Sequence, residues 1–223
     1  MILSLETATA AGSVALHHQG ELLAALTEAN DYSHAERLAP MIDQLLREQG
    51  VATHQLEAVA VSAGPGSYTG LRIGVSTAKG LCYALDIPLL AVSTLEAMLG
   101  GMAQRYPGKW LCPMIDARRM EVYYLLADDR GRIIEPPAPM IIDEHSFAAT
   151  LADHPIVFFG SGAAKCQAVI KNPQAQFVEG VQPTAEQVGY LAWQKYLQQD
   201  FVDTAYFEPE YLKPWVAAKV KTS

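Results

Sequence analysis

The sequence predicts an α/β protein built from two lobes with the same order of strands and helices. Three observations predict this class. Apolar runs of strand length alternate with segments of helical spacing, glycine-rich turns separate them, and the order β-β-β-α-β-α-β-α occurs twice. The 223 residues, 50% hydrophobic and 18% charged, contain enough apolar material for a sizeable core.

The first lobe is expected to span residues 1–105. "ILSLE" predicts a buried strand, and "GSVALHHQ" and "LLAALTE" predict a hairpin that turns at Gly20 and Glu21. A helix over residues 32–50 follows, with Asp31 or Ser33 as its cap. Strand "AVAVS", a glycine loop, a helix over 70–85, strand "LLAVS" and a helix "LEAMLGGMAQ" complete the lobe.

The second, smaller lobe is expected to span residues 106–223 and repeats this order. "WLCPMI" predicts a strand that ends at Asp116, and "EVYYLLAD" and "RIIEPPAPMII" predict a hairpin that turns at 129–131. A short helix "DEHSFAATLA", strand "PIVFF", glycine turn "GSGAAK", helix "AAKCQAVIK", strand "AQFVE" and a helix over 184–198 follow. We expect the final segment to pack back on the first lobe.

The duplication pairs two kinds of site. "SLETA" near Glu6 matches "MIDAR" near Asp116, and "AVSAGPGSYTG" matches "VFFGSGAAK". Two such lobes that face each other would form a cleft, which is the layout of the actin-like ATPase superfamily (the ASKHA, ribonuclease H-like fold), with nucleotide between the lobes. The candidate nucleotide- or anion-binding residues are therefore Glu6, Gly64, Gly66, Asp116, Gly160 and Gly162.

The loop "SAGPGSYTGLRIG" has two interpretations. It lacks the lysine of a Walker A loop, the nearest being Lys79, and its glycines at 64, 66 and 70 do not match the dinucleotide fingerprint. A glycine turn before a helix can still bind an anion on free backbone N–H groups. The other interpretation is a tight strand-to-helix turn. Similarly, the small residues Gly70, Gly74, Ala78 and Cys82 could face their own sheet or a partner subunit.

Composition argues against several classes of function. A net charge of −8 is unfavourable for binding nucleic acid alone. Three scattered cysteines, Cys82, Cys112 and Cys166, predict no disulfide framework and a reducing, cytoplasmic location. The N-terminus resembles no signal peptide, charges interrupt the most apolar stretch, and no histidine pattern predicts a metal site. The sequence contains no Gly-x-Ser-x-Gly motif, so nothing in it indicates a serine hydrolase of that type.

Several stretches closely resemble the bacterial TsaB family, also called YeaZ. They are "MILSLETATA", "YSHAERLAPMIDQLL", the run from "VAVSAGPGSYTGLRIG" to "AVSTLEAM", "MIDARRMEVYY" and "EPEYLK". The family is a degenerate relative of TsaD, which installs threonylcarbamoyl on the adenosine beside the tRNA anticodon. TsaD-type proteins hold a metal with a His-x-x-x-His motif, and here Thr94 and Met98 occupy its two positions, with only Glu96 between them. A hydroxyl and a thioether are poor replacements for imidazole, so the resemblance implies loss of the metal.

The resemblance implies a non-catalytic, activating subunit that binds TsaD, and with it the ATPase TsaE, and that contacts tRNA only through the complex. It also implies self-association of the isolated chain through the same surface, formed by the helices at 32–50 and 70–85. The interface candidates are Leu38, Met41, Leu45, Leu71, Val75 and Ala78. No cofactor is expected to be required. Two rivals remain: a module that binds ADP or ATP weakly, and a peptidase-like or ATP-hydrolysing enzyme.

Overall fold

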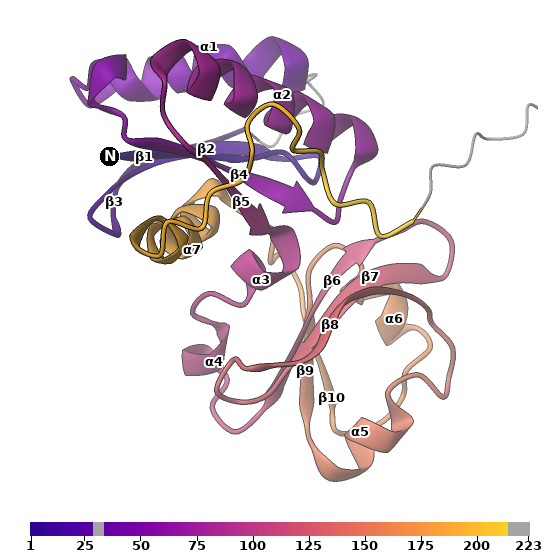
Figure 1. The fold of residues 1–223 in the computed structure, drawn as a ribbon. Coiled ribbons are helices and arrows are strands. Elements are labelled where there is room, and N and C mark those ends of the chain that lie inside the picture. Colours follow the sequence, from indigo (N-terminus) through magenta and orange to yellow (C-terminus); the bar gives the residue numbers. More distant parts are fainter. Residues whose placement is uncertain (29–33, 214–223) are drawn as a thin grey trace, which may run out of the picture.

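The computed structural model describes residues 1–28 and 34–213, which form two lobes around two five-stranded sheets (Figure 1). The first sheet has the strand order β3-β2-β1-β4-β5 and the second has the order β8-β7-β6-β9-β10. In each sheet the first three strands are antiparallel neighbours and the last two pair in parallel. The predicted duplicated α/β fold of the actin-like class is confirmed.

The first sheet forms because its central strands are apolar on both faces. Its strands are β1 (Ile2–Glu6), β2 (Gly12–His18), β3 (Glu21–Glu28), β4 (Ala58–Gly64) and β5 (Leu89–Ser93). Helices α1 (His34–Glu48) and α2 (Tyr68–Leu85) cover one face, and α7 (Ala185–Leu197) packs on β1, β2 and β4. Both faces of β1 and β4 are therefore buried, as continuous hydrophobic runs require.

The second sheet contains β6 (Trp110–Asp116), β7 (Glu121–Ala127), β8 (Ile133–Ile141), β9 (Ile156–Phe159) and β10 (Ala175–Val178). Helices α5 (Ala148–Asp153) and α6 (Ala163–Gln167) share one apolar cluster with it. Helices α3 (Thr94–Met98) and α4 (Met102–Arg105), from the first half of the chain, supply Leu95, Met98 and Met102 to the cluster on its other face.

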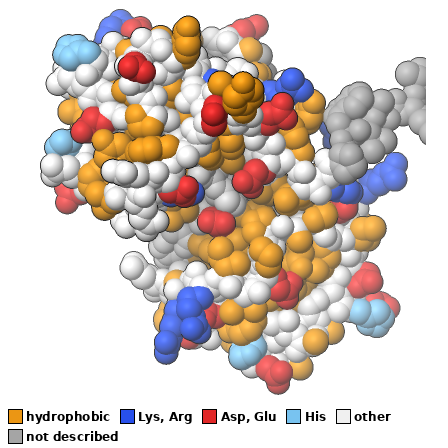
Figure 2. Space-filling view, in the orientation of Figure 1, with side chains coloured by type: hydrophobic (Ala, Val, Ile, Leu, Met, Phe, Trp, Pro, Cys, Tyr) orange, Lys and Arg blue, Asp and Glu red, His pale blue; other side chains and the backbone are white. Residues whose placement is uncertain are grey.

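The two halves of the chain therefore exchange their last helices. The third helical segment of the first half, α3 with α4, packs on the second sheet, whereas α7 of the second half covers the first sheet. The outer face of α7 keeps exposed apolar side chains at Tyr190 and Leu197, and Figure 2 shows hydrophobic side chains in this region.

Some element boundaries differ from the predicted ones. Helix α2 begins at Tyr68, two residues early, because the Ser67 hydroxyl caps it by accepting from the Gly70 amide at 3.2 Å. The single helix predicted from "LEAMLGGMAQ" is two short helices, since Gly101 adopts a positive φ of 73° between them. The cap of α1 predicted at Asp31 or Ser33 lies outside the described residues.

Candidate functional site

A cavity of about 830 Å³ lies between the two lobes, where the predicted cleft was expected. The β1–β2 loop and the N-terminus of α2 form its first wall, and the end of β6 and the β9–α6 turn form its second. Its lining residues are Ala8, Thr9, Ala10, Ala11, Gly66, Ser67, Tyr68, Thr69, Ile115, Asp116, Ala117, Arg118, Tyr123, Ser161 and Gln182. The volume is within the range of small-molecule sites.

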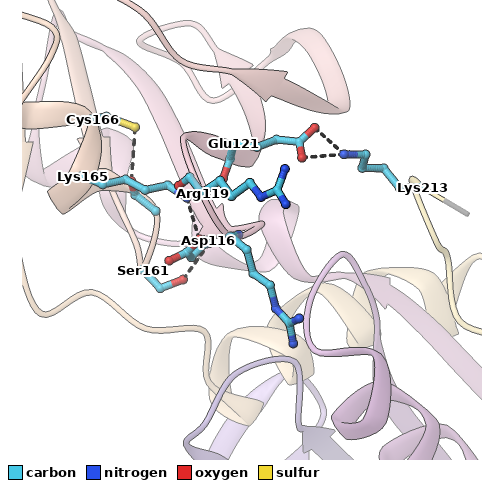
Figure 3. Close-up of polar contacts among 9 residues, drawn as sticks. Asp116, Arg119, Glu121, Ser161, Lys165, Cys166 and Lys213 are labelled. Carbon is cyan, nitrogen blue, oxygen red and sulfur yellow. Dashed lines mark hydrogen bonds and ion pairs between the residues drawn. The ribbon is translucent and has the colours of Figure 1, made fainter. Parts of the chain in front are cut away.

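Asp116 lines this cavity but its charge is already paired. Lys165 of α6 donates to Asp116 Oδ1 at 2.6 Å and also to the carbonyl oxygens of Arg119 and Glu121, at 2.9 and 2.5 Å (Figure 3). The Arg118 amide donates to the same carboxylate oxygen at 2.6 Å. Lys165 thus fixes the β6–β7 turn, in which Arg118 and Arg119 both adopt positive φ angles, 69° and 49°.

Glu6, the predicted partner of Asp116, does not line the cavity. Its side chain is fully buried in the first lobe, where Oε1 accepts from the Ala8 amide at 2.5 Å. Burial raises the pKa of Glu6 to about 7, although the hydrogen bond from the Ala8 amide opposes this effect. The prediction that two acidic strand ends approach the cleft from both sides is therefore corrected: Asp116 does so and Glu6 does not.

The predicted anion-binding glycines serve close backbone contacts. A Cβ at Gly66 would lie 2.5 Å from the Ala8 carbonyl oxygen, which accepts from the Ser67 amide at 2.7 Å. At Gly64, with a φ of 117°, a Cβ would lie 2.7 Å from the carbonyl oxygen of Glu210. Of this pair only Gly66 lines the interlobe cavity. The tight-turn interpretation accounts for both glycines.

The glycines of the matching turn in the second lobe behave similarly. Gly160 has a φ of 98°, and a Cβ there would overlap the Met114 carbonyl oxygen. A Cβ at Gly162 would lie 3.1 Å from the Cβ of Met114. Neither glycine lines the cavity, whereas Ser161 between them does and its hydroxyl accepts from the Asp116 amide at 3.1 Å.

The stripe of small residues on α2 faces the chain's own strands. Gly70, Gly74, Ala78 and Cys82 are all buried, and a Cβ at Gly70 would overlap the Thr7 carbonyl oxygen. A Cβ at Gly74 would overlap the Thr7 hydroxyl. The stripe therefore lets α2 approach the β1–β2 loop closely, which favours the interpretation that it packs within its own lobe.

The six interface candidates on α1 and α2 are core residues in this chain. They are Leu38, Met41, Leu45, Leu71, Val75 and Ala78, and each is at most 3% exposed. The outward surface of the same two helices is formed by residues that the apolar periodicity did not select. A shallow cavity of about 490 Å³ on it is lined by Ala35, Tyr68, Thr69, Arg72, Ile73, Ser76 and Thr77. In the sequence, this surface could have been found from a second, weakly polar stripe along α2, formed by Thr69, Ile73, Ser76 and Thr77.

The residues at the degenerate metal positions do not fit a metal. Thr94 is buried with no hydrogen bond to its hydroxyl among the described residues, and Met98 packs in the apolar cluster with Leu95 and Phe159. Within residues 1–28 and 34–213, no three His, Cys, Asp or Glu side chains gather to hold a metal ion.

Comparison with known proteins shows which family has this architecture. The family described as tRNA N6-adenosine threonylcarbamoyltransferase (TsaD) matches residues 26–219. The tRNA threonylcarbamoyladenosine biosynthesis protein TsaB of Haemophilus influenzae is 31% identical over 98% of this chain and 95% of its own length. The chain belongs to the TsaB (YeaZ) family. The Bacillus subtilis TsaB is 33% identical over 71% of this chain and 70% of its own length.

Solved structures agree with this membership of the TsaB family. YeaZ from Pseudomonas aeruginosa is 32% identical and superimposes with a TM-score of 0.80, over 95% of this chain and 99% of the other. An activator of 2-hydroxyisocaproyl-CoA dehydratase from Clostridium difficile has a TM-score of 0.51 at 10% identity, over 91% of this chain and 98% of that one, a likeness of fold alone. None of the described helices of this TsaB-family chain is long and apolar enough to cross a bilayer.

Proposed function

We propose that this chain is a non-catalytic, activating subunit of the cytoplasmic machinery that transfers threonylcarbamoyl to the adenosine beside the tRNA anticodon. In this proposal it binds TsaD, and TsaE joins the complex. The observation that carries the proposal is the outward surface of α1 and α2, whose cavity of about 490 Å³ contains Arg72 as its one charged lining residue. Depletion of charge is the usual composition of the core of a protein interface.

The shape of α2 supports a helical partner on this surface. Its outward positions include Thr69, Ile73, Ser76, Thr77 and Gly80, which are small or branched residues, beside the larger Arg72 and Tyr83. Short side chains let the axis of another helix approach closely. In the absence of TsaD, the same surface would bury itself against a second copy of the chain.

The distribution of charge supports tRNA binding through partners. The chain has 24 acidic and 16 basic residues besides histidine. Figure 2 shows acidic side chains scattered over both lobes on the face that it presents. Because phosphate contacts require clustered lysine and arginine, the tRNA would be held mainly by the partner proteins.

The test of this role is a reconstituted transfer reaction. The chain alone, TsaD alone and the two together are given tRNA and preformed threonylcarbamoyl-adenylate. We expect no transfer with this chain alone and transfer with both proteins present. Transfer catalysed by this chain alone would refute the non-catalytic role.

The test of the surface uses positions outside the core, the half-buried Thr77 and the exposed Thr27, because Val75→Arg or Ala78→Arg would place a charge in the core. Thr77→Arg should weaken both binding to TsaD and self-association, and Thr27→Arg, at an exposed position on β3, is the matched control. Binding is measured by calorimetry and self-association by sedimentation. If Thr77→Arg changes neither TsaD binding nor self-association, the outward surface of α1 and α2 is not the interface.

A second candidate function is weak binding of ADP or ATP in the interlobe cavity without turnover. The observation that favours it is the presence of Arg118 and the N-terminal residues of α2 in the lining of the 830 Å³ cavity. Calorimetric titration with ADP and with ATP should show binding that Arg118→Ala weakens and that Arg130→Ala, outside the cavity lining, does not. Release of phosphate from ATP, or cleavage of a peptide, would support the enzymatic rival instead.

A further inference from the structure

The segment that follows α7 runs over both lobes. Residues 202–213, here called the strap, leave α7, pass the edge of the first sheet and cross α2 toward the second lobe (Figure 1, yellow). At the sheet edge the Val202 amide donates to the Leu89 carbonyl oxygen at 3.0 Å. The strap therefore contacts the outer edge of β5 at Leu89 before it reaches α2.

Helix α2 and the end of β4 hold the backbone of the strap. The Lys79 ammonium donates to the carbonyl oxygens of Ala205 and Phe207, both at 3.0 Å. The Glu210 amide donates to the Ala63 carbonyl oxygen at 2.8 Å. The carbonyl oxygen of Glu210 occupies the space that a Cβ at Gly64 would approach to 2.7 Å, so the glycine permits this contact.

The end of the strap is attached to the second lobe. Lys213 pairs with both carboxylate oxygens of Glu121 in β7, at 2.6 and 2.5 Å (Figure 3). Two residues earlier, the Tyr211 ring lies 4.8 Å from the ring of Tyr68, which lines the interlobe cavity. One short segment thus contacts β5 and α2 of the first lobe and β7 of the second.

The strap is incompletely packed against the surface beneath it. A cavity of about 250 Å³ lies between it and α2, and another of about 120 Å³ lies beside Glu210 and Lys213. Tyr206 is 85% exposed. A segment with few buried apolar contacts opens more readily than the core of the protein. Val202 and Phe207 pack against the core of the first lobe, and the polar part of the attachment consists of the Lys79, Glu210 and Lys213 contacts.

From these contacts we infer that the strap is a latch between the lobes. Seated on α2, it ties β7 to the first lobe and keeps the interlobe cavity at its present width. Released from α2, it no longer restrains the second lobe, and the lobes separate more widely. The inference rests on the strap contacts alone and does not depend on a TsaD complex or on a bound nucleotide.

The experiment combines amide exchange with distances between the lobes, on the full chain. Lys79→Met removes both hydrogen bonds to the strap carbonyls, and Lys171→Met, which removes a lysine–carbonyl contact within the second lobe, is the matched control. Spin labels at Gln44→Cys and Glu144→Cys, both exposed, report the interlobe distance, since the three native cysteines are buried. We expect Lys79→Met to accelerate exchange of the Glu210 amide about tenfold and to broaden the distance distribution.

A second variant releases the strap at a different contact. Glu210→Pro deletes the amide that donates to Ala63, and it should produce the same faster exchange at Phe207 and the same broader distances. The control Lys171→Met should match the parent chain in both measurements. Faster exchange of the strap without broader distances would overturn the latch, and so would unchanged exchange in both variants.

Discussion

At the scale of single residues, the buried carboxyl of Glu6 shows where sequence reasoning stops. Its position at the end of an apolar strand was predicted, and so was that of Asp116. The packing of the following loop and of the exchanged helices decides which of the two carboxylates reaches the cavity. Local sequence patterns do not predict this packing. Glu6 became an interior residue of the first lobe, whereas Asp116 remained half exposed and paired with Lys165.

The raised pKa of Glu6 predicts a pH-dependent stability. The folded pKa, about 7, exceeds the ordinary value of 4.5, so between these values the folded state holds more protons than the unfolded state. The contribution of Glu6 to the free energy of unfolding therefore falls by about 3 kcal/mol as the pH rises from 4.5 to 7. Above pH 7 this contribution no longer changes.

Glu6→Gln should remove this contribution. Urea denaturation at several pH values from 4.5 to 8 should show the parent chain losing stability relative to the variant as pH rises. Burial lowers the pKa of His17, so this residue makes stability rise with pH. Because both chains contain His17, its effect cancels when the parent chain and the variant are compared. A constant difference between the two chains across this range would show that Glu6 keeps an ordinary pKa.

At the scale of elements, the sequence predicted almost every strand and helix, because alternating apolar runs and helical spacing report local structure directly. It could not predict which sheet α3 and α7 would cover, since an apolar helix face fits either one. The buried face of α2 was correctly predicted to be apolar. It was assigned to a partner subunit, because an apolar pattern does not say which surface a helix packs on. Gly70 and Gly74 identify the real neighbour, which is Thr7.

The glycines of α2 supply a matched pair of substitutions. Gly70→Ala should destabilise the fold by about 1–3 kcal/mol, because its Cβ would overlap the Thr7 carbonyl oxygen. Gly80→Ala, on the same helix with no atom within 4 Å of the new Cβ, should stabilise it by about 0.5–1 kcal/mol. Urea denaturation measures both. Equal effects of the two substitutions would contradict the close approach of α2 to the β1–β2 loop.

At the scale of the whole molecule, the first sheet is covered by parts from both ends of the chain. Ile2, Leu90 and Val92 form one apolar cluster with Val188 and Ala192 of α7. Residues 1–105 alone would leave this face exposed to water. The duplicated order of elements does not indicate this exchange, because each half of the chain has all the elements of a complete lobe.

Two designed chains test this arrangement. Residues 1–105 alone should aggregate or unfold, whereas residues 1–93 joined by a flexible glycine–serine linker to 184–213 should fold with a cooperative thermal transition. Circular dichroism during heating distinguishes the two outcomes. A cooperative transition of the 1–105 chain on its own would show that α7 is dispensable for the first lobe.

The exchange of helices also has a consequence during translation. Strand β1 is made before the whole second lobe, but α7, which covers one of its faces, is made after that lobe. The usual N-terminal-first order of domain folding is therefore unavailable to this chain. The second lobe, built from residues within the span 94–178, has all its helices and strands before the first lobe does. A newly made chain thus completes its second lobe before its first, and one face of the first sheet stays uncovered until α7 has been made.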